Sequence, residues 1–346
     1  MAPKTMKQWR VQGTSGFDCL KFDSQAPVPE VGDKEVLVKF NASSLNYRDL
    51  CISKGFYPFP VSDNIVPGSD GAGVVEAVGK KVTRFRPGDR VVTLFHQEHF
   101  GGSLDPHSIQ TAIGGLLPGT QREYGTFDEQ GLLQSPKNLN DIETSTLTCA
   151  ALTSWNALYG LKQLKPGEYV LTQGTGGVSI FAVQFAKAAG AKVIATTSSA
   201  KKAELLKKLG ADHIINYKED PNWGETAKKL TPNQVGVDHV IEVGGATTLK
   251  QSLNCIKLDG IISLIGFVGG NSKEPEPSFL EALAHVCTVR AVFVGSRLQM
   301  EEMIRAIEAN DIHPVVDEKV FTLGQLKEAY QYMWDQKHFG KLCIKI

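Results

Sequence analysis

The stretch from Tyr169 to Ser179 constrains the fold of this chain more than any other. An apolar run ends at Gln173, a glycine-rich turn follows, and apolar residues at helical spacing continue from Ile180 until Gly190. Strand, tight turn and helix in this order form the context that a dinucleotide-binding glycine motif requires. A turn needed only for packing is the alternative interpretation. We expect dinucleotide binding, because further alternating strand and helix signals follow.

Each glycine of the turn has a predicted role. Gly174 can make the sharp turn, Gly176 leaves room for a pyrophosphate, and Gly177 allows close packing of helix on strand. The N–H groups at the start of the helix would then face the phosphates. The expected cofactor contacts in the turn are Gly174, Thr175, Gly176, Gly177 and Val178.

Length, charge and cysteine spacing indicate a protein of more than one domain and argue against the nucleic-acid-binding, membrane-spanning and disulfide-rich classes. A chain of 346 residues is too long for one ordinary core, and its formal net charge of zero gives no reason to expect a nucleic acid or an anionic membrane as partner. The first ten residues lack the apolar core of a signal peptide, and no apolar run could span a bilayer. The 6 cysteines form no C-x-x-C pair, which argues against a disulfide framework. We therefore expect a small-molecule substrate and a cytoplasmic location.

The pattern of predicted elements changes twice along the chain. Residues 1–152 contain short strands and turns, residues 153–295 alternate strictly between strand and helix, and residues 296–346 contain two helices and two short strands. The alternation predicts a doubly wound parallel sheet. Its strands are expected at 169–173, 192–196, 213–216, 237–242, 260–265 and 288–294, and those of the tail near 315–321 and 341–346. The tail strands would suit a return to the first domain, with the nucleotide domain as an insertion.

The residues after the second predicted strand indicate the form of the dinucleotide. A protein that prefers NAD usually ends this strand with an acidic residue, whereas here hydroxyl and ammonium groups follow with no carboxylate. Such groups suit a 2′-phosphate, so we expect NADP(H), with Lys202 as the charge partner. The alternative is that these side chains only cap and solvate the helix that begins near Ala200. The expected contacts are Thr197, Ser198, Ser199, Lys202 and Tyr217.

Several short motifs, in order over the whole chain, resemble the medium-chain dehydrogenase/reductase superfamily. They are Leu45–Asp49, Pro67–Gly73, Arg86–Val91, Leu152–Thr153, Gly174–Val178, Leu209–Tyr217 and His338–Lys341. The resemblance implies an α/β fold in which both ends of the chain build a GroES-like, β-rich catalytic domain and a Rossmann domain is inserted between them. It also implies a homodimer, formed by pairing of the sixth strand across a two-fold axis.

The departures from the zinc-dependent members of this superfamily are informative. Asn46 stands where those members have the first Cys ligand, Ser69 and Asp70 replace the His and Glu of the usual Gly-His-Glu motif, and Cys149 remains. A thiol, a hydroxyl and an amide do not supply the ligands of a catalytic zinc. We therefore expect no metal and a resemblance to the zinc-free branch, which includes quinone oxidoreductases and enoyl reductases. Ser179 replaces the last glycine of the turn.

Without zinc, reduction of a C=C bond conjugated to a carbonyl is easier than reduction of a plain ketone, because the charge spreads into an enolate that hydrogen-bond donors can hold. The predicted function is NADPH-dependent hydride transfer to an enone, enoyl group or quinone. An alcohol or aldehyde oxidoreductase without zinc, and an NADPH-binding protein with little turnover, remain as alternatives. The candidate catalytic residues are Asn46, Tyr47, Arg48 and Tyr57, although Tyr57 could be a packing aromatic and Arg48 could pair with Asp49.

Other expected cofactor contacts come from strand ends and from the resemblance. They are Thr153, Gly244, Gly266, Phe267, Val268, Arg297 and Lys341. The stretch 95–122 takes the place of the zinc-binding lobe and reads as one irregular loop. Its residues His96, Glu98, His99 and His107 could be a metal cluster, but we favour a solvated loop or a lid over the substrate.

Overall fold

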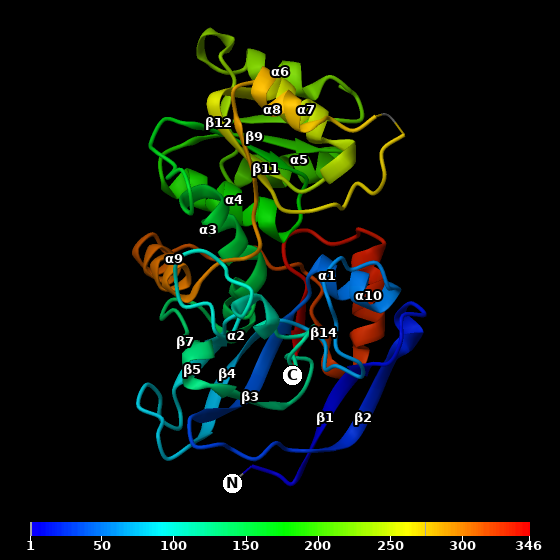
Figure 1. Ribbon diagram of the computed structural model, residues 1–346, viewed down its shortest axis with the longest axis vertical. Coiled ribbons are helices and arrows are strands. Elements are labelled where there is room, and N and C mark those ends of the chain that lie inside the picture. The colour runs from blue at the N-terminus through cyan, green and yellow to red at the C-terminus, as the bar shows by residue number, and fades with distance from the viewer. Residues whose placement is uncertain (1, 274) are drawn as a thin grey trace. The chain divides into compact units, whose positions relative to one another are not determined.

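The computed structural model describes residues 2–273 and 275–346, and the chain forms two compact units. The first, here called the terminal unit, contains the residues up to Leu152 together with Gly295–Ile346. The second, the central unit, is Thr153–Val294. Figure 1 follows the chain through both units, from blue at the N-terminus to red at the C-terminus.

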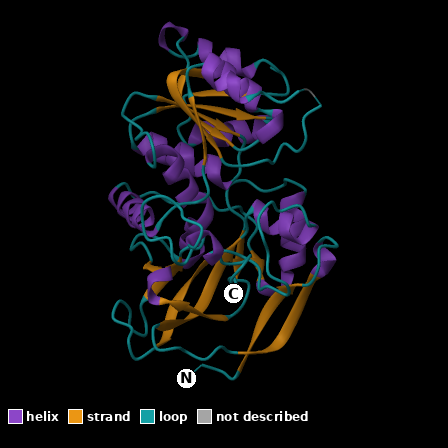
Figure 2. Cartoon of the chain, viewed as in Figure 1, coloured by secondary structure: helices purple, strands orange, loops and turns teal. Residues whose placement is uncertain are grey.

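The central unit is built on a six-stranded sheet in which every neighbouring pair of strands is parallel, in the order β10-β9-β8-β11-β12-β13. Helices lie on both sides of this sheet (Figure 2). The strands are β8 (Tyr169–Gln173), β9 (Lys192–Thr197), β10 (His213–Asn216), β11 (Val237–Glu242), β12 (Ile256–Leu264) and β13 (Thr288–Ala291). The helices are α3 (Leu152–Tyr159), α4 (Gly177–Ala188), α5 (Ala200–Lys208), α6 (Trp223–Lys229), α7 (Leu249–Cys255) and α8 (Phe279–Ala284).

Local sequence explains where these elements begin and end. The hydroxyl of Ser199 accepts a hydrogen bond from the amide of Lys202 at 3.4 Å and so caps α5, as expected for a serine at this position. Gly190 and Gly210 follow α4 and α5 with φ values of 77° and 94°, a conformation that terminates helices and that glycine adopts without strain. The inner strands β8, β9 and β11 are buried over nearly their whole length, as parallel strands covered by helices must be, whereas the edge strand β13 is largely exposed.

The terminal unit is β-rich. A seven-stranded sheet has the order β14-β15-β3-β4-β5-β7, with β6 paired to β3, and a separate ribbon pairs β1 with β2. The strands are β1 (Thr5–Val11), β2 (Leu20–Pro27), β3 (Glu35–Ser44), β4 (Asp70–Val78), β5 (Arg90–Thr93), β6 (Tyr124–Asp128), β7 (Leu132–Gln134), β14 (Phe321–Thr322) and β15 (Cys343–Lys345). The helices are α1 (Tyr47–Lys54), α2 (Asp141–Thr144), α9 (Arg297–Ala309) and α10 (Leu326–Trp334). Strand β15, near the C-terminus, pairs with β3, near the N-terminus, so both ends of the chain build one sheet.

Two expected elements differ from the structure. The strand expected near 315–321 is wrong over most of its length, because β14 contains only Phe321 and Thr322. Strand pairing before β14 is limited to an isolated parallel bridge between Val316 and Lys341. The carboxylate of Asp317 then accepts hydrogen bonds from the amides of Lys319 (2.9 Å) and Phe339 (2.8 Å), and this side-chain turn follows the bridge. The strand expected at 288–294 ends at Ala291, before Val294, whose φ of 56° is incompatible with a strand.

Candidate active site

The short helix α1 presents the first group of candidate residues. Strand β3 ends at Ser44 and α1 begins at Tyr47, so residues 45–46 connect the end of this strand to the helix. The carboxylate of Asp49 accepts the backbone N–H of Asn46 at 2.8 Å, which closes the start of the helix. Asn46, Arg48 and Asp49 are buried in the terminal unit. Polar side chains buried at a helix start need partners, and those partners define the site.

Lys341 is the central partner, and it is only 2% exposed. Its ammonium group donates to the side-chain oxygen of Asn46 (2.7 Å), to the carboxylate of Asp70 (3.1 Å) and to the backbone carbonyl of Leu45 (2.7 Å). An ammonium has three N–H bonds, and protein oxygens accept all of them. The expected contact of Lys341 with the cofactor stays a prediction, and this geometry does not favour it.

Serine hydroxyls complete the network around Asp70. The hydroxyl of Ser69 donates to one carboxylate oxygen at 2.7 Å, and that of Ser44 donates to the other at 2.9 Å. Asn46 in turn donates its amide N–H to Ser69 at 3.3 Å. Two of the positions at which a zinc-dependent relative would carry ligands, Asn46 and Ser69, are therefore joined to each other and, through Asn46, to a lysine cation.

The remaining thiol does not restore a metal site. Cys149 lies in a π-helical turn, Leu147–Ala151, and is one thiol where a catalytic zinc needs three strong nitrogen or sulfur ligands. In the part of the chain that the structure describes, no three or more side chains of His, Cys, Asp or Glu come together so that they could hold a metal ion. The residues present here do not fit a catalytic zinc.

Arg48 and Tyr57 form a second group next to this network. The guanidinium of Arg48 donates to the phenol oxygen of Tyr57 (3.4 Å) and to the carbonyl of Ile113 (3.1 Å). It lies over the rings of Tyr57 and Phe95, with its central carbon 5.2 Å and 4.8 Å from their centroids. Arg48 is 8% exposed, and Asp49 is 3.7 Å away. Pairing with Asp49, the alternative role considered for Arg48, is therefore one of several contacts that the guanidinium makes.

The charge states of these groups follow from burial. Burial raises the pKa of the Tyr57 phenol, although the nearby Arg48 lowers it in part, so the phenol keeps its proton at neutral pH. Because its oxygen accepts from Arg48, the phenol O–H remains available to donate to another acceptor. Burial also raises the pKa of Asp49 to about 6, since the attraction of Arg48 only partly offsets the loss of water.

Tyr47 differs from the other three candidates. Its ring stacks on Trp334 at a centroid distance of 6.4 Å and lies 6.5 Å from Phe56. The structure therefore joins Arg48 to Tyr57 and Asn46 to Lys341, whereas the contacts described for Tyr47 are with aromatic rings. A catalytic role for Tyr47 stays a prediction.

The stretch 95–122 is more ordered than expected. His96 and His99 are buried, so the expectation of a solvated loop is wrong for them, whereas His107 is exposed and bonds to Glu98 at 2.6 Å. A 3₁₀ turn, Ser108–Thr111, follows, and the carbonyl of Ile113 then holds Arg48. A Cβ at Gly115 would lie 2.7 Å from the Arg48 guanidinium. Sequence reasoning missed this contact, and its signal was the glycine pair at 114–115.

The glycine turn of the central unit has the geometry expected for a phosphate site. Gly174 has a φ of 71°, and an added Cβ at Gly174 or Gly176 would meet no protein atom within 4 Å. Helix α4 starts at Gly177 without a side-chain cap, which leaves its dipole available to an anion. The hydroxyl of Ser179 donates to the carbonyl of Gln173 at 2.6 Å, so the serine that replaces a glycine helps to close the turn. This cradle fits a dinucleotide pyrophosphate.

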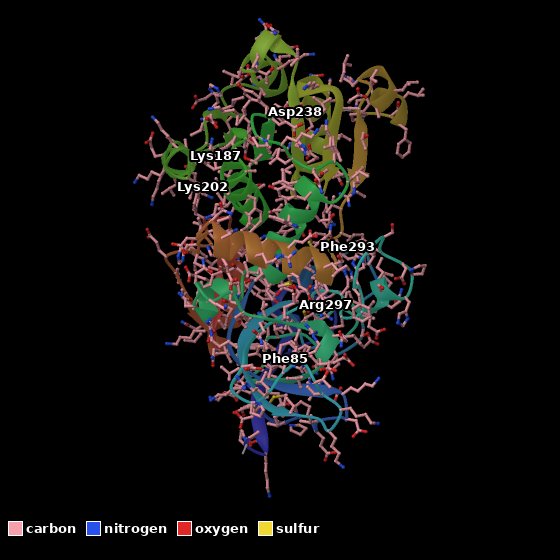
Figure 3. All side chains as sticks on the ribbon, turned by 90° about the vertical axis from the view of Figure 1, so that its left-hand side faces the viewer. Phe85, Lys187, Lys202, Asp238, Phe293 and Arg297 are labelled. Carbon is pink, nitrogen blue, oxygen red and sulfur yellow. The ribbon has the colours of Figure 1, made fainter. Side chains whose placement is uncertain are left out.

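The residues expected at a 2′-phosphate lie at the adjacent strand end. Thr197 is the last residue of β9 and accepts the amide of Tyr217 through its carbonyl at 3.1 Å. Ser199 caps α5 and Lys202 lies in its first turn, within the central unit (Figure 3). The structure thus brings these groups to the carboxyl ends of β9 and β10.

The other expected contacts lie on several elements. Gly244 follows β11 and its amide bonds within the protein, to Gln173 and Glu242, while Gly266 and the half-exposed Phe267 and Val268 follow β12. Thr153 is in the first turn of α3. Arg297 begins α9 and bonds to Gln130 and to Glu301 within the terminal unit (Figure 3), so its cofactor contact stays a prediction. Glu242 and Gln173 were not anticipated from the sequence.

Comparisons with known proteins match both units. The family model described as an alcohol dehydrogenase GroES-like domain matches residues 32–137, and that described as a zinc-binding dehydrogenase matches residues 177–309. A zinc-type alcohol dehydrogenase-like protein of Schizosaccharomyces pombe is 49% identical over 336 residues, which is 96% of each chain. The chain belongs to the medium-chain dehydrogenase/reductase superfamily. The fold expected from the resemblance is confirmed.

More distant members of the superfamily carry several activities in their names. An acryloyl-coenzyme A reductase of Sulfurisphaera tokodaii is 28% identical, covering 93% of this chain and 95% of its own. A crystal structure described as an alcohol dehydrogenase from Sinorhizobium meliloti aligns with a TM-score of 0.91 at 38% identity over 100% of both chains. A mycobacterial structure in complex with NADPH aligns with a TM-score of 0.82 at 26% identity, over 99% of this chain and 100% of its own.

The protein is therefore an oxidoreductase of this superfamily that uses a nicotinamide cofactor. Over residues 2–273 and 275–346, no helix combines the length and apolar composition needed to cross a bilayer.

Proposed function

We propose that this superfamily member reduces an activated C=C bond, in an enone, enoyl thioester or quinone, with NADPH and without a catalytic zinc. The observation that carries the proposal is the position of the Lys341 ammonium, which bonds to Asn46, at the position of the first Cys ligand of a zinc-dependent relative, and to Asp70, next to the position of its His ligand. With a buried cation already compensated by Asp70, a divalent metal at the same place would meet strong repulsion.

The preference for NADPH rests on the end of β9. No carboxylate follows this strand to accept from the adenosine ribose hydroxyls, and the hydroxyls of Ser198 and Ser199 and the ammonium of Lys202 follow instead. Two lysines in the first turn of a helix oppose its dipole, and a bound phosphate would remove that conflict. The complex of a mycobacterial relative with NADPH agrees with this preference.

The chemistry of the terminal unit suits an enolate. When bound, a reduced nicotinamide would supply a hydride, that is two electrons and a proton, for the β carbon of the substrate. The guanidinium of Arg48 is buried and fixed by Ile113 and two aromatic rings, and we assign to it the stabilisation of the negative charge that develops on the carbonyl oxygen. The Tyr57 O–H donates a proton to complete the reduction, and water returns that proton to the phenol.

The alternative of an alcohol or aldehyde oxidoreductase without zinc requires the same groups to act on one carbonyl oxygen, where the charge is not delocalised. The names of the Schizosaccharomyces pombe and Sinorhizobium meliloti proteins point in this direction, whereas the name of the acryloyl-coenzyme A reductase points to C=C reduction. An NADPH-binding protein with little turnover would bind the cofactor and reduce no substrate of either class.

The test is NADPH oxidation followed at 340 nm against a panel of enones, enoyl thioesters, quinones and simple aldehydes, with and without a metal chelator. We expect turnover of the conjugated substrates that the chelator leaves unchanged, and a metal content well below one zinc per chain. Activity limited to alcohols or aldehydes and lost with chelator would overturn the proposal. Tight NADPH binding without turnover of any compound would support the binding protein instead.

A further inference from the structure

The strand order of the central unit makes two loops equivalent. Strands β8 and β11 are neighbours at the middle of the sheet. The strands that follow β8 in sequence, β9 and β10, lie on one side of this pair, and those that follow β11, β12 and β13, lie on the other. In such a sheet, each half binds one mononucleotide at the loop after its first strand. The glycine turn follows β8, and the loop Val243–Thr248 follows β11 in the corresponding place. Both loops could in principle offer backbone N–H groups to a phosphate.

In the second loop an internal carboxylate accepts these N–H groups. Glu242, the last residue of β11, is fully buried. One of its oxygens accepts the amides of Gly244 and Gly245 at 2.9 Å each and the hydroxyl of Thr248 at 2.5 Å. The arrangement is that of an anion in a nest of amides, with the anion supplied by the protein.

Gln173 connects this carboxylate to the glycine turn. Its side-chain nitrogen donates to the second oxygen of Glu242 at 2.7 Å and to the hydroxyl of Ser252 at 2.9 Å. Its side-chain oxygen accepts the amides of Val243 and Gly244 at 3.1 Å and 3.2 Å. Since Gln173 directly precedes Gly174, one buried pair of side chains fixes the two loops relative to each other.

The two loops therefore differ in what they can bind. Helix α4 begins without a side-chain cap and with open space beside Gly176, whereas the amides of Gly244 and Gly245 already have an anion. A second negative charge would be repelled by Glu242 across a low-dielectric interior. Of these two loops, the first is therefore the one suited to a phosphate.

We infer that Glu242 is a positioning residue for the cofactor: its carboxylate occupies the anion nest of the second mononucleotide half. It thereby directs the pyrophosphate to α4 and, through Gln173, holds Val243–Thr248 in the shape that receives the nicotinamide ribose. The inference requires a bound nicotinamide dinucleotide and does not depend on which substrate is reduced.

The main test substitutes the carboxylate by its isosteric amide, Glu242→Gln. The new amide nitrogen would face the side-chain nitrogen of Gln173, and the charge in the nest would be lost. Calorimetry would measure the dissociation constant of the cofactor, NADPH or NADH, that binds the unchanged chain more tightly. It would also measure the dissociation constant of the adenosine half alone, which is 2′,5′-ADP for NADPH and 5′-ADP for NADH. We expect the dissociation constant of the whole cofactor to rise about tenfold or more and that of the adenosine half to change less than about twofold.

Asp238→Asn is the matched control. Asp238 (Figure 3) is a buried carboxylate on the same strand, but it bonds to the Tyr169 amide and to Lys257 at the other end of the sheet. We expect this variant to melt at a lower temperature and to bind the whole cofactor as before. If Glu242→Gln does not fold, Thr248→Val removes one donor to the carboxylate and should weaken binding of the whole cofactor in the same direction.

Three results would overturn the inference. Equal losses for the whole cofactor and its adenosine half would show a general defect of the unit. Equal losses in the Glu242→Gln and Asp238→Asn variants would show an effect of stability alone. Unchanged binding in both Glu242→Gln and Thr248→Val would show that the network does not position the cofactor. Failure of the substrate panel described above would leave these binding measurements interpretable.

Discussion

At the scale of single residues, two buried cations of the candidate site, Lys341 and Arg48, have different surroundings. The ammonium of Lys341 has three oxygen acceptors, including the carboxylate of Asp70, and is saturated. The guanidinium of Arg48 has a carbonyl, a phenol and two aromatic rings, and its nearest carboxylate, on Asp49, is 3.7 Å away. Only a cation whose charge is incompletely compensated can stabilise a charge that develops on a substrate.

Substitution of Tyr57 tests the proton donor. Tyr57→Phe keeps the ring under Arg48 and removes the O–H, so we expect kcat for enone reduction to fall by about a hundredfold or more while NADPH affinity is retained. Steady-state kinetics and calorimetric titration measure the two quantities. Tyr332→Phe is the control, since that phenol bonds to Asp317 in the same unit. Unchanged kcat in the Tyr57 variant would assign the proton to another donor.

Buried His96 makes stability depend on pH. Burial lowers its pKa from 6.5 to about 3, so the folded state resists a proton that the unfolded chain accepts. Its contribution to the free energy of unfolding is fully present above pH 6.5 and is lost as the pH falls towards 3. In a His96→Gln variant, the slope of that free energy against pH should decrease by about 1.4 kcal/mol per pH unit within this window.

Urea unfolding at several pH values measures the slope. The control is His107→Gln, because the Glu98 carboxylate raises the pKa of this exposed histidine and its contribution is lost as the pH rises. A slope in the His96 variant equal to that of the unchanged chain would show that other groups govern acid stability.

At the scale of elements, the glycine turn and α4 form a cradle whose backbone features arise from local sequence. The positive φ of Gly174, the open space at Gly176 and the uncapped start of α4 arise from residues adjacent in sequence. The network of Asn46, Asp70 and Lys341 is the opposite case, because its members come from three distant elements. Motif spacing could predict the first and could not predict the second.

A methyl group at Gly176 tests the turn. An added Cβ there meets no protein atom, and the φ of −75° suits alanine, so Gly176→Ala should fold normally. Because the methyl would enter the space expected for the pyrophosphate, we expect the dissociation constant of NADPH to rise about tenfold or more. Calorimetry and thermal melting measure the two effects. Gly324→Ala, at a similarly open position in the terminal unit, should change neither, and equal NADPH affinity in both variants would refute this role.

At the scale of the whole molecule, the central unit leaves a surface that suits a second copy. Strand β13 is the edge strand of its sheet, and α8 exposes Phe279, Leu280 and Leu283. An open edge and a cluster of exposed apolar side chains are features of an association surface. The homodimer expected from the family resemblance would bury both.

Light scattering after size-exclusion chromatography tests this expectation. We expect the unchanged chain to have the mass of a dimer and the Phe279→Ser/Leu283→Ser variant to shift towards the monomer. Leu161→Ser, at another exposed leucine of the central unit, is the control and should keep the dimer mass. A monomer at all concentrations in the unchanged chain would contradict the prediction.

The sequence by itself determined the elements whose causes are local. Apolar runs, the caps at Ser199 and Gly210 and the glycine turn act within a few residues, so the parallel sheet, its helices and the cofactor cradle could be anticipated from them. The tertiary structure decided which side chains lie together. Lys341 meets Asn46 only because β15 pairs with β3, and Glu242 meets Gln173 only because β11 lies beside β8. Such contacts depend on strand pairing between distant segments, and no local pattern encodes them.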